Sequence, residues 1–141
     1  MLTLDQANRI IAGAFAKATE LHLAPLTVVV LDRSGIPIAL QSQDGSAPLR
    51  HKIAHGKAYG AVGLGIGSRA IFKRAQEQPY FVGAVATAAE GAVIPVPGGV
   101  LIRSAQGAVI GAVGVTGDTS DNDEAAAVHG ITAADLTADP G

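Results

Sequence analysis

The segment from Pro97 to Gly117 constrains the fold more than any other part of the chain. It reads PGGVLIRSAQGAVIGAVGVTG and holds two apolar runs, Val100–Ile102 and Val109–Val115, joined by a short glycine-containing connection. Two β-forming runs joined in this way predict a β-hairpin. The second run contains two glycines, which weaken a strand, so we expect its backbone to lie close to another element. Helix-on-sheet packing and a ligand-facing surface both fit this spacing.

The N-terminal part predicts a helix followed by a second β-hairpin. Apolar residues recur at three- and four-residue steps over Leu4–Leu21, and Thr3 and Gln6 before them have capping-box spacing. The β-branched run Leu26–Asp32 is typical of a strand covered on both faces. After a tight turn, Ile36–Gln41 is expected to return as its partner strand.

The middle of the chain predicts two helices. Ser46-Ala47-Pro48 is typical of a helix start, because proline is tolerated in the first turn. The three alternating glycines of the segment Gly63–Gly67 end that helix, and Ser68 is expected to cap a short helix through Arg74. A phosphate loop at these glycines is disfavoured, since they follow a helix and lack the characteristic lysine.

The C-terminal part is less regular. The segment from Gln78 to Val96 fits a short helix, a strand or a mobile flap, whereas Asp121–Glu124 has capping spacing for a terminal helix. The tail Thr137–Gly141 shows no pattern and is expected to fray. Because short turns and not helical crossovers join adjacent strands, the sequence predicts one α+β domain over residues 1–141, an antiparallel sheet with helices packed on it.

Composition excludes several classes of function. The chain has 141 residues, no cysteine, 48% hydrophobic and 16% charged residues, and a net charge of −2. Disulfides, Fe–S clusters and thiolate catalysis are therefore excluded, and no basic patch indicates nucleic acid binding. No signal peptide and no apolar run of about 18 residues are present, so we expect a cytoplasmic protein away from membranes. The apolar balance favours a homo-oligomer.

Several motifs together resemble one known family. They are LTLDQANRIIAGAFAKATEL, VVLDRSGIPIAL, Asp44-Gly45, Gly56-Lys57-Ala58, Pro97-Gly98-Gly99-Val100 and GAVIGAVGVTGDTSDNDE. This set resembles the GlcG/HbpS/PduO-C family, often described as a haem-binding or haem-degrading domain, from Leu2 to about Ile131. The resemblance implies a profilin-like five-stranded sheet flanked by helices, a haem ligand and an oligomer assembled from dimers. Leu101 and Gln43 depart from the family pattern, which commonly has proline and arginine there.

Haem iron needs an axial donor, usually His, Cys, Met or Tyr. Cysteine is absent and the one methionine is terminal, which leaves six candidates: His22, His51, His55, His129, Tyr59 and Tyr80. His51 and His55 are four residues apart on a predicted helix, so their imidazoles share a face. Haem or metal ligation, general acid–base catalysis and a purely structural role all remain open for this pair. A protein-bound metal would need a third ligand.

The sequence contains further candidate ligand-binding residues besides this histidine pair. Lys57 fits either a contact to a propionate or substrate carboxylate, or an ion pair with a carboxylate such as Asp44. The backbone amides of Gly98 and Gly99 are unobstructed by side chains and suit an anion. Arg103 is placed to reach a carboxylate from the same strand. His22 is a further possible cofactor ligand, although a histidine at a helix end also suits the helix dipole.

Three functional hypotheses follow. The first is an oligomeric domain that binds haem or another planar or acidic small molecule. The second is a cofactor-free or metal-assisted enzyme acting on a small carboxylated metabolite, with His51, His55 or Lys57 as acid–base groups and the Gly98 and Gly99 amides stabilising negative charge. The third is a structural subunit without a ligand. The low aromatic content, 4%, argues against a haem pocket.

Overall fold

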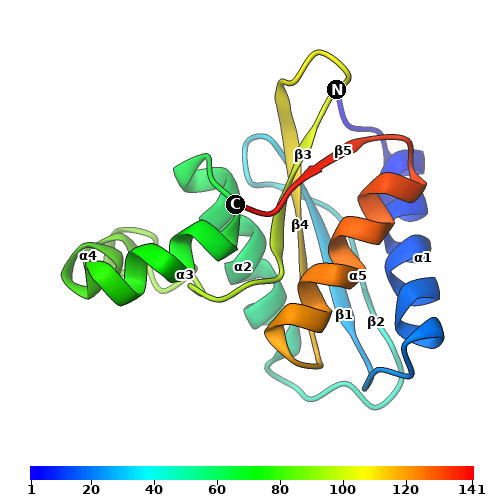
Figure 1. Ribbon diagram of the computed structural model, residues 1–141, viewed down its shortest axis with the longest axis horizontal. Helices are drawn as coiled ribbons and strands as arrows, with labels where there is room; N and C mark the ends of the chain where they lie inside the picture. The colour runs from blue at the N-terminus through cyan, green and yellow to red at the C-terminus, as the bar shows by residue number, and fades with distance from the viewer.

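A computed structural model describes residues 1–141 as one sheet surrounded by five helices (Figure 1). The five strands are antiparallel throughout and lie in the order β2-β1-β4-β3-β5. The elements are α1 (Leu4–Glu20), β1 (Thr27–Asp32), β2 (Pro37–Ser42), α2 (Arg50–Leu64), α3 (Ser68–Glu77), α4 (Pro79–Ala88), β3 (Gly99–Arg103), β4 (Val109–Thr116), α5 (Ser120–Ala133) and β5 (Thr137–Asp139). The α+β class and the five-stranded profilin-like sheet are confirmed.

The sheet separates two helical layers (Figure 1). Side chains alternate across a strand, so Val28 and Val30 of β1 join the core under α1 and α5, while Val29 and Leu31 join the core under α2. Every residue from Leu26 to Leu31 is fully buried. The expectation that this strand is covered on both faces is therefore confirmed.

The predicted glycine-rich hairpin is formed by β3 and β4, and its glycines let α2 pack directly on the sheet. A Cβ at Gly114 would overlap the carbonyl oxygen of Ala54, and one at Gly99 would overlap that of Lys57. Both carbonyl groups belong to α2, so side chains at these two positions would push the helix away. Helix-on-sheet packing thus accounts for Gly99 and Gly114, whereas a Cβ at Gly111 would overlap the Leu31 carbonyl oxygen of β1.

The capping box of α1 is confirmed, but the starts of the other predicted helices differ. Thr3 accepts a hydrogen bond from the Gln6 amide and its own amide donates to the Gln6 side chain, at 3.1 and 3.0 Å. Helix α2 begins at Arg50, later than the predicted start at 46–48, and the cap before α3 is Gly67 and not Ser68. Helix α5 is capped by Thr119, so the expectation of a cap at 121–124 was wrong.

The two least regular segments are both ordered elements. Residues 79–88 form α4, and the tail expected to fray forms β5, which pairs with β3 through Ile102 and Ala138. Arg103 binds the Asp139 carboxylate through two nitrogens, at 2.9 and 2.8 Å. The prediction for the tail was wrong because this strand has three residues, too few for a periodic pattern.

Helices α3 and α4 extend away from the sheet on the side of α2 (Figure 1). No helix of the protein is both long and apolar enough to cross a bilayer.

Candidate functional site

Helix α2 presents two different faces. Ala54, Ala58 and Ala61 are fully buried against the sheet, where small side chains permit close packing. His51 and Tyr59 lie four residues on either side of His55, so all three side chains share one flank of the helix, next to the alanine face, and Tyr59 still packs against the core. The helix therefore places the predicted histidine pair on a common face beside strand β2, because Leu40 of that strand lines the same groove.

A groove of about 450 Å³ lies along this histidine face. We call it the histidine groove; its lining residues are Leu40, His51, Lys52, His55, Glu90, Gly91 and Ala92. Its walls come from β2, from α2 and from the segment that follows α4. The rings of His55 and Tyr59 stack, with centroids 5.3 Å apart and planes inclined by 21°. This stacking orients the His55 imidazole beside the open groove.

The groove offers nitrogen donors and a cation at an accessible surface. His51 and Lys52 are exposed and His55 is half-buried, so all three are open to a ligand. No group of three His, Cys, Asp or Glu side chains is close enough to hold a metal ion. The histidine pair thus suits a metal centre that brings most of its own ligands.

A second hollow, of about 510 Å³, has different chemistry. It lies beside the β1–β2 turn and is lined by Met1, Leu2, Asp32, Arg33, Ser34, Ile38 and Ile110. It contains no imidazole and no residue predicted from the sequence to bind a ligand. The slightly smaller histidine groove is therefore the better candidate for the functional site.

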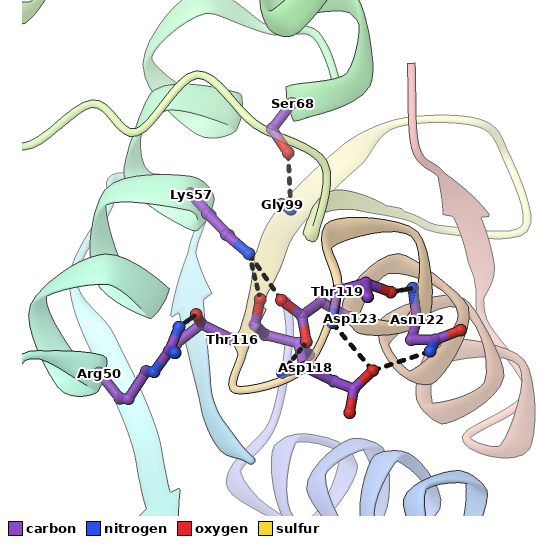
Figure 2. A network of polar contacts seen from close by, with 10 residues as sticks. Arg50, Lys57, Ser68, Gly99, Thr116, Asp118, Thr119, Asn122 and Asp123 are labelled. Atoms are coloured by element: carbon purple, nitrogen blue, oxygen red, sulfur yellow. Dashed lines mark hydrogen bonds and ion pairs between the residues drawn. The ribbon is translucent and has the colours of Figure 1, made fainter. Parts of the chain in front are cut away.

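Lys57 points the other way, into the protein (Figure 2). Its ammonium group donates to the Asp123 carboxylate at 2.9 Å and to the Val115 carbonyl oxygen at 3.0 Å. The other oxygen of Asp123 accepts the Asp118 amide at 2.9 Å. Both charged side chains are 2% exposed. The ion pair joins α2 to α5 across the end of β4, so the partner of Lys57 is Asp123 and not Asp44.

Burial opposes ionisation of both partners. Desolvation lowers the pKa of Lys57, while the attraction and hydrogen bond of Asp123 act in the opposite direction. Desolvation likewise raises the pKa of Asp123, against the attraction of Lys57. Because every buried side-chain nitrogen and oxygen has a hydrogen-bond partner, the pair is well satisfied. Lys57 acts here as a structural link between layers.

The diglycine lies beside the same link. Gly98 has a φ of 121° and its carbonyl oxygen accepts the Val115 amide at 2.9 Å. The Gly99 amide donates to the buried Ser68 hydroxyl at 2.7 Å (Figure 2). The hydroxyl expected to cap α3 therefore binds the start of β3. The Gly99 amide, predicted to bind an anion, is already engaged within the chain.

The structure does not bring the remaining candidates to the histidine groove. His22 is exposed, has a φ of 54° and follows α1, in the layer on the other side of the sheet. His129 is exposed on α5, in the same layer as α1. Arg103 ends β3 and is held by Asp139. Of the predicted site residues, only His51 and His55 line the groove.

The two departures from the family pattern both have structural roles. Leu101 is fully buried in β3, within the core under α2. The side-chain oxygen of Gln43 accepts the Leu26 amide at 2.8 Å, which ties the end of the β1–β2 hairpin to the start of β1. Neither residue lines the histidine groove.

Sequence reasoning missed three important residues. Asp123 was interpreted only as part of a helix cap, although a lysine in an apolar, alanine-rich helix face needs a carboxylate partner. Leu40 and Glu90 complete the histidine groove. They come from β2 and from the segment after α4, and no periodic spacing relates them to the histidines.

Comparisons with known proteins give a consistent picture. The model of the family "Haem degrading protein HbpS-like" matches residues 2–132. Among solved structures, a complex of PduOC with haem has a TM-score of 0.85 at 20% identity and covers 96% of both chains. Protein ORFY from Klebsiella pneumoniae has a TM-score of 0.84 at 28% identity, covering 94% of this chain and 90% of its own.

A third solved structure is a double mutant of HbpS from Streptomyces reticuli. It has a TM-score of 0.78 at 26% identity, with 93% of this chain and 85% of its own covered. No curated protein matches the chain.

Proposed function

Because the chain belongs to the HbpS-like family, we propose that it is an oligomeric cytoplasmic domain that binds haem, or a related planar acidic molecule, in the histidine groove. The observation that supports this most is the pair of imidazoles, His51 and His55, on one wall of an open groove beside a cationic side chain.

The donor set of the groove suits haem better than a free metal ion. A porphyrin supplies four nitrogen ligands to its iron, so the protein has to supply only one or two axial donors. The groove offers two imidazoles, and no His, Cys, Asp or Glu side chain completes a three-ligand metal site with them. A free divalent ion would lack ligands there, whereas a haem iron would not.

The rest of the groove suits a planar acid. Leu40 and Ala92 give apolar surface, and the exposed ammonium group of Lys52 can pair with a propionate. Haem iron would supply a metal centre for ligand binding or redox chemistry. The chain's own contribution would be an imidazole nitrogen, a cation for a carboxylate and an apolar wall. The solved complex of PduOC with haem supports haem as the first ligand to test.

Absorbance titration with haemin tests this proposal. We expect a Soret shift that saturates at one equivalent per chain and is lost or displaced in His51→Ala or His55→Ala. His129→Ala on α5 is the matched control and should behave like the wild type. No saturable shift, or identical spectra for both groove variants and the wild type, would contradict the proposal. Iron-free protoporphyrin separates binding of the planar acid from iron ligation.

The enzyme hypothesis has less support. It assigns acid–base work to Lys57 and anion stabilisation to the Gly98 and Gly99 amides. Lys57 is instead bound to Asp123 inside the protein, and the Gly99 amide is bound to Ser68. These groups lie on the sheet side of α2, away from the histidine groove.

A further inference from the structure

Helix α4 is an apolar helix with almost nothing packed on it. Its sequence, PYFVGAVATA, contains no charged residue, and only Val82 is buried. Tyr80 and Phe81 are 74% and 37% exposed. Figure 1 shows α4 at the end of the molecule furthest from the sheet, beyond α3. Such a helix normally buries its apolar side, and here most of that side faces outward.

The outward side of α4 remains apolar along its length. Tyr80, Ala84 and Ala88 are all exposed and recur every four residues, so they line one face. The hydroxyl of the neighbouring Thr87 donates to the Gly83 carbonyl oxygen at 3.1 Å, so it is satisfied within the helix. The Tyr80 hydroxyl is the one polar side-chain group among the residues that line this face.

A hollow of about 230 Å³ lies at the C-terminal half of the same helix. Its lining is mostly apolar and combines α2, α4 and the segment after α4: Tyr59, Gly60, Gly63, Leu64, Val85, Ala88, Ala89 and Val93. The helix thus has a protruding aromatic side chain near its N-terminus and a recess near its C-terminus.

We propose that α4 pairs with α4 of a second copy, antiparallel, around a two-fold axis that passes near Ala84. In this arrangement Tyr80 of one copy faces Ala88 of the other, because both lie four residues from Ala84. The exposed tyrosine then enters the partner's hollow, and the same contact occurs twice. A two-fold interface requires this kind of self-complementary surface.

Charges at the two ends of α4 complement each other in the same way. The Arg74 guanidinium lies 5.1 Å from the centre of the Phe81 ring, at the N-terminal end of α4. Glu90 follows the C-terminal end, and neither residue has an ion-pair partner within its own chain. Antiparallel pairing brings each Arg74 to the partner's Glu90.

This pairing also completes the histidine groove. Glu90 lines the groove, so the partner's Arg74 arrives at its rim and adds a second cation for an acidic ligand. The pairing itself does not rest on the proposed haem function, since it uses only side chains of the ligand-free protein.

The paired surface is small. A helix of ten residues is about 15 Å long, so α4 alone covers less than the roughly 800 Å² per partner of a standard interface. We therefore expect ligand-free dimers that dissociate on dilution. Sedimentation velocity of the full chain across a concentration series tests this.

The central variant is Ala84→Glu, which places two like charges at the axis and lies at an exposed position of its own chain. It should weaken dimerisation by about 100-fold or more. Ala12→Glu, at an exposed alanine of α1, is the matched control and should dimerise like the wild type. A wild type that is monomeric at every concentration, or an assembly insensitive to Ala84→Glu, would overturn the proposal.

Two further variants test the geometry. The chain has no cysteine, so Ala84→Cys should form a covalent dimer on mild oxidation, while Ala12→Cys should not. Arg74→Glu and Glu90→Arg should each weaken the dimer, and the double variant should restore it. Equal cross-linking at both cysteines, or no restoration, would overturn the antiparallel register. If the protein is monomeric and binds lipid vesicles, and Ala84→Glu abolishes this binding, then α4 contacts a membrane and not a second copy.

Discussion

At the scale of single residues, the Lys57–Asp123 pair is the most consequential polar contact. Both side chains are almost fully buried and link α2 to α5. Replacing one partner leaves an unpaired charge in the interior, whereas replacing both with apolar residues does not. The pair therefore stabilises the domain mainly because each member needs the other.

We predict that Lys57→Met lowers the free energy of unfolding by about 3–5 kcal/mol, because Asp123 is left unpaired. The double variant Lys57→Met with Asp123→Leu should recover most of this loss. Urea unfolding measures both effects. Lys52→Met, at an exposed position on the same helix, should change stability by less than about 0.5 kcal/mol. Equal losses for Lys57→Met and Lys52→Met would disprove the assigned role.

Asp118 should make stability depend on acid pH. Hydrogen bonds from the Asn122 side chain and from the Ala24 and Thr119 amides hold the pKa of its carboxyl below the ordinary value. A pKa that is lower in the folded state adds stability above the unfolded pKa of about 4, and this stability is lost as the pH falls through the folded pKa.

Asp118→Asn should therefore be less stable than the wild type at pH 7 and lose less stability than the wild type on acidification to pH 3. Asp44→Asn, at an exposed position, is the control and should follow the wild type at both pH values. Parallel pH profiles for Asp118→Asn and the wild type would argue against this account.

The sequence predicted the position of Lys57 on its helix but not its partner. Helical periodicity relates residues three or four apart, and Asp123 lies 66 residues from Lys57. The two meet only because β4 leads directly into α5 beside α2. For the same reason, the sequence paired His51 with His55 but could not place Leu40 or Glu90 opposite them.

At the scale of elements, the contact between α2 and the sheet depends on Gly114. We predict that Gly114→Ala destabilises the protein by about 1–3 kcal/mol or prevents folding, because its methyl group meets the Ala54 carbonyl oxygen. Gly63→Ala is the matched control: its Cβ would face open space in the same helix, so it should stabilise by about 0.5–1 kcal/mol. In thermal unfolding, the melting temperature should fall for Gly114→Ala and rise for Gly63→Ala.

Strand β5 should contribute measurably to the stability of the sheet. Removing Thr137–Gly141 deletes its hydrogen bonds to β3 and the Arg103–Asp139 ion pair, so we expect a loss of about 1–3 kcal/mol. Hydrogen exchange should become faster at β3 amides and stay slow in β1 and β4. Unchanged exchange at Leu101 and Arg103 would show that the tail does not protect β3.

Long periodic elements were predictable and short ones were not. The amphipathic pattern of α1 and the β-branched run of β1 extend over several turns or side-chain pairs, so local physics suffices. Helix α4 is apolar on all sides, which leaves helix and strand indistinguishable by periodicity. Strand β5 forms only because it can pair with the edge of β3, a contact that its own three residues do not reveal.

At the scale of the whole molecule, two sides of α2 have different roles. The side toward the sheet contributes Lys57 and the alanines to stability, and the flank beside β2 presents His51 and His55 in a groove. Substitutions of His51 and His55 should therefore leave the core intact. The proposed α4 pairing would bring a second copy to the rim of the same groove.

Native mass spectrometry of haemin-treated protein tests the central claim most directly, because it counts subunits and bound haem in one spectrum. The wild type should carry one haem per chain. The His51→Ala/His55→Ala variant should keep the same subunit number and carry none. Retention of haem by this variant at the wild-type level, or its absence from the wild type, would contradict a haem site in the histidine groove.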